Sequence, residues 1–194
     1  MAGRPTRSPR VSPGLTAPAP ARALVAAALA GTLLVGCGAV VGESPGNSVI
    51  VIGSGGLVGQ PAPPFRLADL AGATVSLSDY AGRPVIVNFW ASWCIPCQQE
   101  FPMYRQARDE FESRGLEVLG IIHDDASDAA RAFMTRHGGD WPALLDPGDA
   151  VASAYRVVGI PTSFFVDRHG TIRDVSYGPP PADALAAYVQ QILQ

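Results

Sequence analysis

Residues 85–104 read VIVNFWASWCIPCQQEFPMY, and this stretch decides the fold. Its opening residues are apolar and β-branched or aromatic apart from Asn88, which is typical of a strand buried in the centre of a sheet. Residues 95–114 then follow a helical pattern. Cys94 and Cys97 lie where the strand ends and the helix begins. The stretch therefore predicts a strand that delivers two thiols to the N-terminus of a helix.

Strand and helix patterns alternate along the rest of the chain from residue 59. We expect strands at 65–67, 74–77, 84–89, 116–122, 162–167 and 171–176, and further helices at 127–137, 149–155 and 182–193. The first two strands are short and flanked by Gly and Pro, which indicates a hairpin at the edge of a sheet. The order predicts an α/β fold with a central sheet flanked by helices on both faces.

Composition and charge exclude several classes of function. The chain has 194 residues, and all 14 of its basic residues other than His are Arg. The absence of lysine excludes a phosphate-binding P-loop and Schiff-base chemistry. From Cys37 onward, 10 Arg face 17 acidic residues, a balance of −7. A surface this acidic argues against nucleic-acid binding through phosphate neutralisation.

Residues 1–36 have the pattern of a secretory signal. Four Arg precede a 13-residue apolar run at 23–35 without any charge. The run ends in Leu-Val-Gly-Cys at 34–37, which resembles a bacterial lipobox, so we expect Cys37 to carry the lipid and to become the first residue. An uncleaved membrane anchor over 23–41 and cleavage at another position remain as alternatives. Each of these interpretations places the functional domain outside the cytoplasm.

Residues 37–58 are predicted to be a lipid-anchored flexible linker, because Gly and Ser repeatedly interrupt the apolar residues. The functional domain is then predicted over residues 59–194. Neither an internal repeat nor a second domain is expected there.

The spacing Cys94-Ile95-Pro96-Cys97 brings two thiols within one helical turn, close enough to form a disulfide. Free backbone N–H groups and the helix dipole stabilise a thiolate at a helix N-terminus. A thiolate attacks a substrate disulfide to give a mixed disulfide, which the second thiol resolves. We therefore expect Cys94 to be the exposed nucleophile and Cys97 the shielded resolving thiol.

A Cys-x-x-Cys pair also has other functions in proteins. A structural zinc site needs about four ligands, and the three His residues show no ligand spacing around the pair. Covalent haem attachment needs His at position 98, where this chain has Gln98. A purely structural disulfide and a copper chaperone remain as alternatives. The redox interpretation calls for no metal and no other cofactor.

The chain from Gly59 onward resembles the TlpA/ResA-like thioredoxins, which are membrane-tethered thiol-disulfide oxidoreductases of bacteria. The resemblance is carried by Gly-Gln-Pro-Ala-Pro at 59–63, by the block at 77–94 and by Gly-Ile-Pro-Thr at 159–162. It implies a thioredoxin-like fold with a mixed sheet and an extra N-terminal β-hairpin.

The resemblance also implies roles for individual residues. Cys94 and Cys97 match the redox pair, and Pro161 matches a cis-proline opposite the disulfide. Together with Trp93 and Ile160, Pro161 is expected to bind the substrate, because the exposed edge beside it would hold a peptide in an extended conformation.

Glu100 matches a family acid that lies beneath the redox pair. On a helix it shares a face with Cys97 three residues earlier, so a buried Glu100 would exchange a proton with that thiol. The alternative is an exposed acid that the helix dipole favours. Asn88 stands where thioredoxins proper carry a buried Asp, and it cannot titrate.

Two directions of electron flow stay open. The first is reduction of extracytoplasmic disulfides such as those of apocytochrome c, with electrons from a membrane donor; the second is disulfide formation in secreted proteins. A non-catalytic binding module is a third alternative. A peroxidase is excluded, because that motif requires Thr and Pro where this chain has Ala91 and Val87.

Overall fold

The computed structural model describes residues 54–194. The predicted signal at 1–36, the lipid attachment site at Cys37 and most of the predicted linker lie outside these residues. Within the described part of the chain, every helix is too short or too polar to cross a lipid bilayer.

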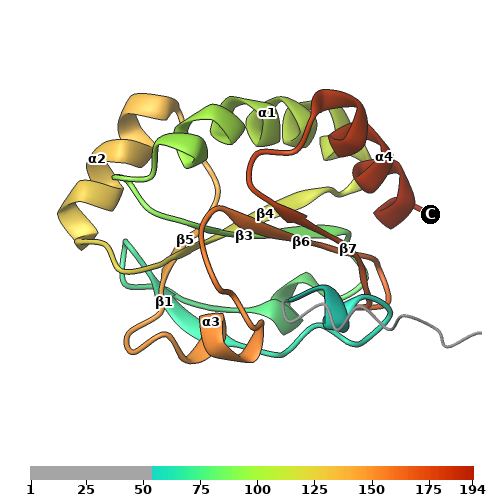
Figure 1. Ribbon diagram of the computed structural model, residues 1–194, viewed down its shortest axis with the longest axis horizontal. Coiled ribbons are helices and arrows are strands. Elements are labelled where there is room, and N and C mark those ends of the chain that lie inside the picture. Colours follow the sequence, from blue (N-terminus) through green and yellow to red (C-terminus); the bar gives the residue numbers. More distant parts are fainter. Residues whose placement is uncertain (1–53) are drawn as a thin grey trace, which may run out of the picture. The chain divides into compact units, whose positions relative to one another are not determined.

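Seven strands form one mixed sheet in the order β2-β1-β5-β4-β3-β6-β7 (Figure 1). The strands are β1 (Arg66–Asp69), β2 (Thr74–Ser76), β3 (Val85–Trp90), β4 (Glu117–Ile122), β5 (Ala143–Leu145), β6 (Thr162–Val166) and β7 (Ile172–Tyr177). Strands β3, β4 and β5 run parallel, and the other neighbouring strands are antiparallel. The predicted α/β fold with a mixed central sheet and an N-terminal hairpin, formed by β1 and β2, is confirmed.

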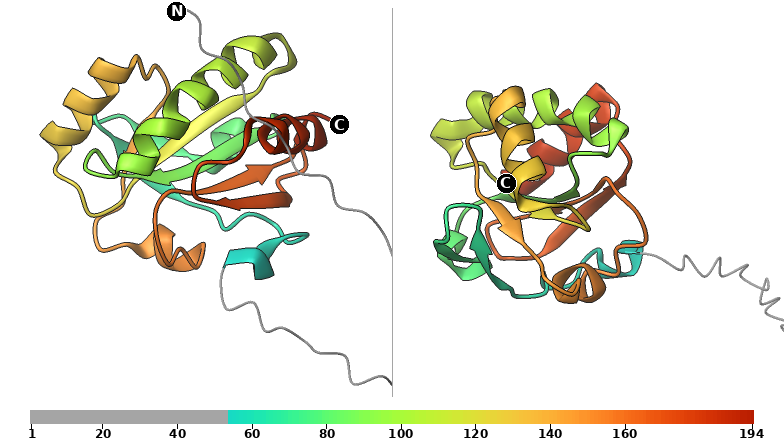
Figure 2. Two further views of the ribbon diagram at one scale, coloured as in Figure 1. Left: turned by 45° about the horizontal axis from the view of Figure 1, so that its top comes forward. Right: turned by 90° about the vertical axis from the view of Figure 1, so that its left-hand side faces the viewer.

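Helices cover both faces of the sheet (Figures 1 and 2). The α-helices are α1 (Ile95–Phe111), α2 (Ser127–His137), α3 (Ala150–Ala154) and α4 (Ala182–Ile192), and the 3-10 helices are η1 (Ser54–Leu57), η2 (Leu77–Tyr80) and η3 (Glu112–Arg114). The helices α1, α2 and α4 lie on one face, and α3 lies on the other (Figure 2). The central strand β3 therefore contacts a core on each side.

Side chains of β3 alternate between these two cores, as the geometry of a strand requires. Ile86 and Trp90 pack in the core beneath α1, α2 and α4, whereas Val87 and Phe89 pack in the core on the α3 side. Asn88 lies between Ile86 and Trp90 in this alternation and so faces α1. One polar residue in an otherwise apolar strand thus reaches the helix that carries the thiols.

The hairpin joins the sheet through β5, where Ala68 pairs with Leu145. We did not predict β5 from the sequence, because three residues after Pro142 are too few to show an alternating pattern. At the other edge, residues 59–62 run beside β7. The Gly59 N–H donates to the Ile172 carbonyl at 2.8 Å, and the Ile172 N–H donates to the Gln60 carbonyl at 3.0 Å.

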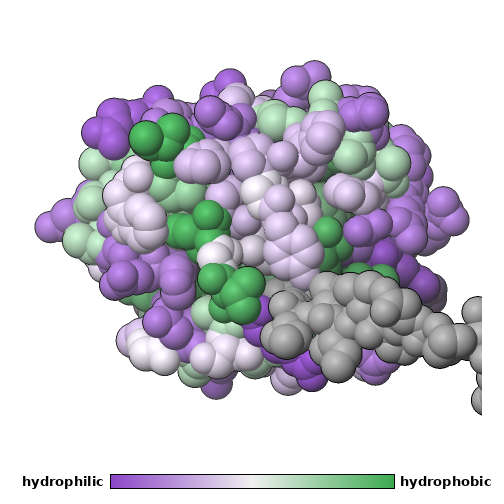
Figure 3. Space-filling view, in the orientation of Figure 1, coloured by the Kyte–Doolittle hydropathy of each residue, from purple (hydrophilic) through white to green (hydrophobic). Residues whose placement is uncertain are grey.

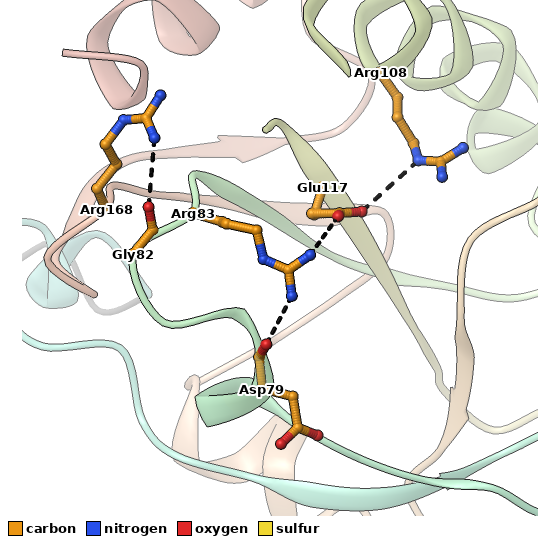
Figure 4. Close-up of polar contacts among 6 residues, drawn as sticks. All are labelled: Asp79, Gly82, Arg83, Arg108, Glu117 and Arg168. Atoms are coloured by element: carbon orange, nitrogen blue, oxygen red, sulfur yellow. Dashed lines mark hydrogen bonds and ion pairs between the residues drawn. The ribbon is translucent and has the colours of Figure 1, made fainter. Parts of the chain in front are cut away.

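A polar cluster joins the starts of β3 and β4, at the end of the sheet opposite the two cysteines (Figure 4). Arg83 Nη1 lies 2.7 Å from Glu117 Oε1, and Arg83 Nη2 donates to the Asp79 carbonyl at 2.7 Å. Arg108 from α1 lies 3.9 Å from the same carboxylate. Because these side chains are partly exposed to water, each ion pair contributes at most about 1 kcal/mol to stability.

The face seen in Figure 3 carries its hydrophobic residues in small, separate patches among hydrophilic ones. Among the described residues, the exposed large hydrophobic side chains are Val58, Trp93, Ile95, Val158 and Tyr177. Two of these, Trp93 and Ile95, are the neighbours of Cys94 in the sequence. The two cysteines thus lie beside exposed apolar side chains.

Candidate active site

Cys94 and Cys97 form a disulfide with an S–S distance of 2.01 Å. Cys94 is the N-cap residue of α1, and its sulfur accepts a hydrogen bond from the Cys97 backbone N–H at 3.2 Å. Pro96 occupies the first helical turn, where a missing N–H costs nothing. The Cys94 sulfur therefore lies at the end of the helix that stabilises negative charge.

The two cysteines differ in exposure by only a small amount. Cys97 is fully buried, and Cys94 is 4% exposed. Cys94 is the more exposed of the two cysteines, as the sequence analysis expected. Its side chain is nevertheless buried, whereas we expected an exposed one. Trp93 and Ile95 on either side of it are 57% and 68% exposed. A partner would therefore meet these two side chains before it reaches the Cys94 sulfur.

Two hydrogen bonds connect the loop before Cys94 to the loop between β4 and α2. The Ser92 N–H donates to Asp125 Oδ2 at 2.6 Å, and Trp93 Nε1 donates to the Asp124 carbonyl at 2.9 Å. These loops meet because β3 and β4 are parallel neighbours whose carboxyl ends lie at the same edge of the sheet. We did not single out Asp125 from the sequence, although two adjacent acids within three residues of the end of a predicted strand were a usable signal.

The peptide bond between Ile160 and Pro161 is cis, at the start of β6. Because Phe89 pairs with Thr162, this segment lies beside the end of β3, where the loop to Cys94 begins. Ile160 packs against the core that contains both cysteines. The structure thus brings Trp93, Ile160 and Pro161 to the same edge of the sheet as the disulfide.

Glu100 lies one turn after Cys97 on α1 and is 1% exposed, which excludes the alternative of an exposed acid. Its Oε1 accepts a hydrogen bond from Asn88 Nδ2 at 2.7 Å, and its Oε2 lies 3.3 Å from the Tyr104 hydroxyl. Burial raises the pKa of the Glu100 carboxyl from 4.5 to about 8, because the interior cannot hydrate a carboxylate. The hydrogen bonds from Asn88 and Tyr104 lower this pKa and so oppose the effect of burial.

Comparison with known proteins identifies the family to which this chain belongs. The model of the AhpC/TSA family matches residues 58–175, more than half of the chain. The thiol-disulfide oxidoreductase ResA of Bacillus anthracis is 30% identical over 135 residues, which span 70% of this chain and 78% of that protein. The ResA of Bacillus subtilis (strain 168) is 34% identical over 134 residues, which span 69% of this chain and 75% of that protein.

The chain is a thiol-disulfide oxidoreductase of the AhpC/TSA family. Solved structures agree with this assignment. A thiol:disulfide interchange protein of the thioredoxin family from Chlorobium tepidum TLS has a TM-score of 0.63 at 29% identity, covering 69% of this chain and 96% of that one. The thioredoxin domain of a thiol-disulfide oxidoreductase from Bacteroides vulgatus has a TM-score of 0.64 at 27% identity, covering 71% and 98%. The resemblance of this oxidoreductase to ResA-like thioredoxins, stated from its motifs, is therefore confirmed.

The buried carboxyl should make the stability of this oxidoreductase depend on pH. Because the pKa of Glu100 is higher in the folded than in the unfolded chain, its stabilising effect is complete below about pH 4.5 and is lost as the pH rises through about 8. We expect the difference in unfolding free energy between wild type and Glu100→Gln to fall by about 1 kcal/mol per pH unit between these limits. Denaturant unfolding of the oxidised protein between about pH 4 and 9 measures it.

Glu110→Gln is the matched control, since Glu110 is an exposed carboxylate on the same helix. It should leave the pH dependence of the unfolding free energy as in wild type. A wild type and a Glu100→Gln variant with parallel stability curves would contradict a proton held on Glu100 in the folded state.

Proposed function

We propose that this oxidoreductase reduces protein disulfides on the extracytoplasmic face of the bacterial cell membrane, using the dithiol of Cys94 and Cys97. The observation that carries the proposal is the position of the Cys94 sulfur, which caps α1 and accepts the Cys97 N–H. A sulfur in this position is stabilised as a thiolate, both for attack and as a leaving group.

The reaction starts from the reduced form. The Cys94 thiolate attacks one sulfur of a client disulfide, the client S–S bond breaks, and the first client thiolate leaves and takes up a proton. Cys97 then gives up its proton and attacks the Cys94 sulfur, which breaks the mixed disulfide and releases the second client thiolate, which also takes up a proton. The client gains two electrons and two protons, and the protein is left with the Cys94–Cys97 disulfide that the structure contains.

Glu100 is proposed to accept the proton of Cys97 in the second step. Both side chains are buried on one face of α1, one turn apart, where bulk water cannot take the proton. A carboxyl with a pKa of about 8 is about one tenth ionised at pH 7 and half ionised at about pH 8, so it can both take and return a proton within one pH unit of neutrality.

Client binding is proposed at the edge formed by Trp93, Ile160 and Pro161. The exposed indole of Trp93 supplies apolar contact area, and the segment before β6 offers backbone groups to an extended peptide. The clients are proteins with accessible disulfides, of which apocytochrome c before haem attachment is the one we propose. A membrane protein with a dithiol would return the two electrons.

The order of the cysteines can be tested by trapping. We expect Cys97→Ser to accumulate mixed disulfides between Cys94 and a disulfide-containing client protein, because the resolving thiol is missing. Non-reducing electrophoresis followed by mass spectrometry identifies the cross-linked cysteine.

Cys94→Ser is the matched control and should trap no client. The assignment of Cys94 as nucleophile fails if Cys94→Ser traps clients as efficiently as Cys97→Ser, or if alkylation of the reduced protein labels Cys97 first.

The direction of electron flow follows from the reduction potential of the Cys94–Cys97 pair. We expect a value of about −270 mV or lower, as in reductants, measured by equilibration of the domain with glutathione or dithiothreitol buffers. A potential near −120 mV, as in strong oxidants, would instead identify a protein that forms disulfides in secreted proteins.

Anchoring is proposed to occur through a lipid on Cys37 after removal of residues 1–36. We expect Cys37→Ala to leave an uncleaved precursor or to release the protein from the membrane, read out by fractionation and by the mass of the mature chain. A variant with the wild-type mass and full membrane retention would instead point to residues 23–41 as an uncleaved anchor.

A further inference from the structure

Four polar side chains meet in the interior beneath the redox pair, contributed by β3, α1 and β6. They are Asn88, Glu100, Tyr104 and Ser163, and each is no more than 1% exposed. Asn88 Nδ2 lies 2.7 Å from Glu100 Oε1 and 2.9 Å from Ser163 Oγ. The Tyr104 hydroxyl lies 2.8 Å from Ser163 Oγ and 3.3 Å from Glu100 Oε2. These contacts close a ring of four hydrogen bonds.

The number of hydrogens in this ring depends on the charge of Glu100. With an ionised carboxylate there are four, two on the Asn88 amide and one each on Tyr104 and Ser163. All four can be used, because Asn88 donates to Glu100 and to Ser163, the Ser163 hydroxyl donates to Tyr104, and the Tyr104 hydroxyl donates to the carboxylate. Four hydrogens thus match four contacts.

A protonated Glu100 adds a fifth hydrogen to the same four contacts. The carboxyl then donates to the Tyr104 oxygen, and Tyr104 turns to donate to Ser163. Ser163 Oγ now accepts from both Asn88 and Tyr104, so its own hydrogen has no acceptor within the ring. The two hydroxyls can reverse their hydrogen bonds, but only the ionised form uses every donor.

We propose that Tyr104, held by Ser163, is a positioning residue whose hydroxyl reverses its hydrogen bond as Glu100 gains or loses a proton and so stabilises the ionised carboxylate. Without this ring, burial alone would keep the carboxyl protonated far above neutral pH. The consequence for thiol exchange rests on the role of Glu100 proposed above, whereas the effect on the charge of Glu100 does not.

Few other groups act on this carboxyl. On α1 the Cys97 sulfur, which is part of the disulfide, lies one turn before Glu100. Strand β3 contributes the Asn88 amide, and β6 contributes the Ser163 hydroxyl. From α4, Tyr188 acts on Tyr104. Burial raises the pKa of Glu100, and the hydrogen bonds from Asn88 and Tyr104 lower it. Charged neighbours make no contribution to this pKa.

The test is Tyr104→Phe, which removes the hydroxyl and keeps the buried ring. We expect the ionisation midpoint of Glu100 in the oxidised protein to rise by about one pH unit, since a hydrogen bond to a charged group is lost. Carbon-13 NMR of the glutamate carboxyl groups follows this midpoint, and Glu100→Gln identifies the resonance. Ser163→Ala should move the midpoint in the same direction by a smaller amount.

Tyr177→Phe removes an exposed hydroxyl outside the ring and is the control that should leave the midpoint unchanged. If the midpoint stays at the wild-type pH in both Tyr104→Phe and Ser163→Ala, the inference is overturned. A rise of the midpoint in both variants supports the inference. If one variant does not fold, the other variant decides alone.

The pH profile of the thiol exchange rate separates this inference from the proposed function. We expect the profile of Tyr104→Phe to move to higher pH by the same amount as the NMR midpoint, and the move to vanish when Glu100→Gln is also present. If the NMR midpoint moves but the exchange profiles of wild type and Glu100→Gln coincide, the hydrogen-bond ring stands and the proposed proton transfer from Cys97 fails.

Discussion

A carboxyl group enclosed by apolar side chains needs partners, and the partners of Glu100 determine much of the arrangement around it. Asn88 can donate to it only because β3 alternates and sends every second side chain toward α1. Ser163 reaches the same place because Asn88 and Ser163 are paired across β3 and β6. The hydrogen bonds of this one acidic side chain therefore require the observed register of β3 with β6 and the observed orientation of α1.

The same strand also positions the disulfide and the residues around it. Beyond Trp90, β3 passes into the loop that holds Cys94 at the start of α1, and the neighbouring loop after β4 fixes that loop through Asp125. The cis peptide before Pro161 lies at this edge as well, since β6 starts beside the end of β3. The proposed nucleophile, the proposed client edge and the buried carboxyl are thus positioned by one central strand and its two neighbours.

The sequence predicted the elements whose pattern is local and missed those that depend on distant contacts. The central strand, α2 with its bounds at Ser127 and His137, and the edge hairpin follow from periodicity and from Gly and Pro. The strand β5 has three residues and forms only because β4 and β1 lie on either side of it. Glu100 was identified, but its ring with Tyr104 and Ser163 was not, because contacts between residues 59 positions apart have no local signature.

The hairpin and the segment before it also have a consequence for self-association. A sheet edge with free N–H and C=O groups is a template for pairing with another chain. On one side the hairpin covers β5, so that β2 becomes the edge strand. Strand β2 has only three residues, and two of them are the polar residues Thr74 and Ser76. On the other side residues 59–62 hydrogen-bond to the outer edge of β7 at its start. Pro61, one of these residues, has no N–H that could pair with another chain. The hairpin border and the start of β7 are thereby poor sites for aggregation by strand addition.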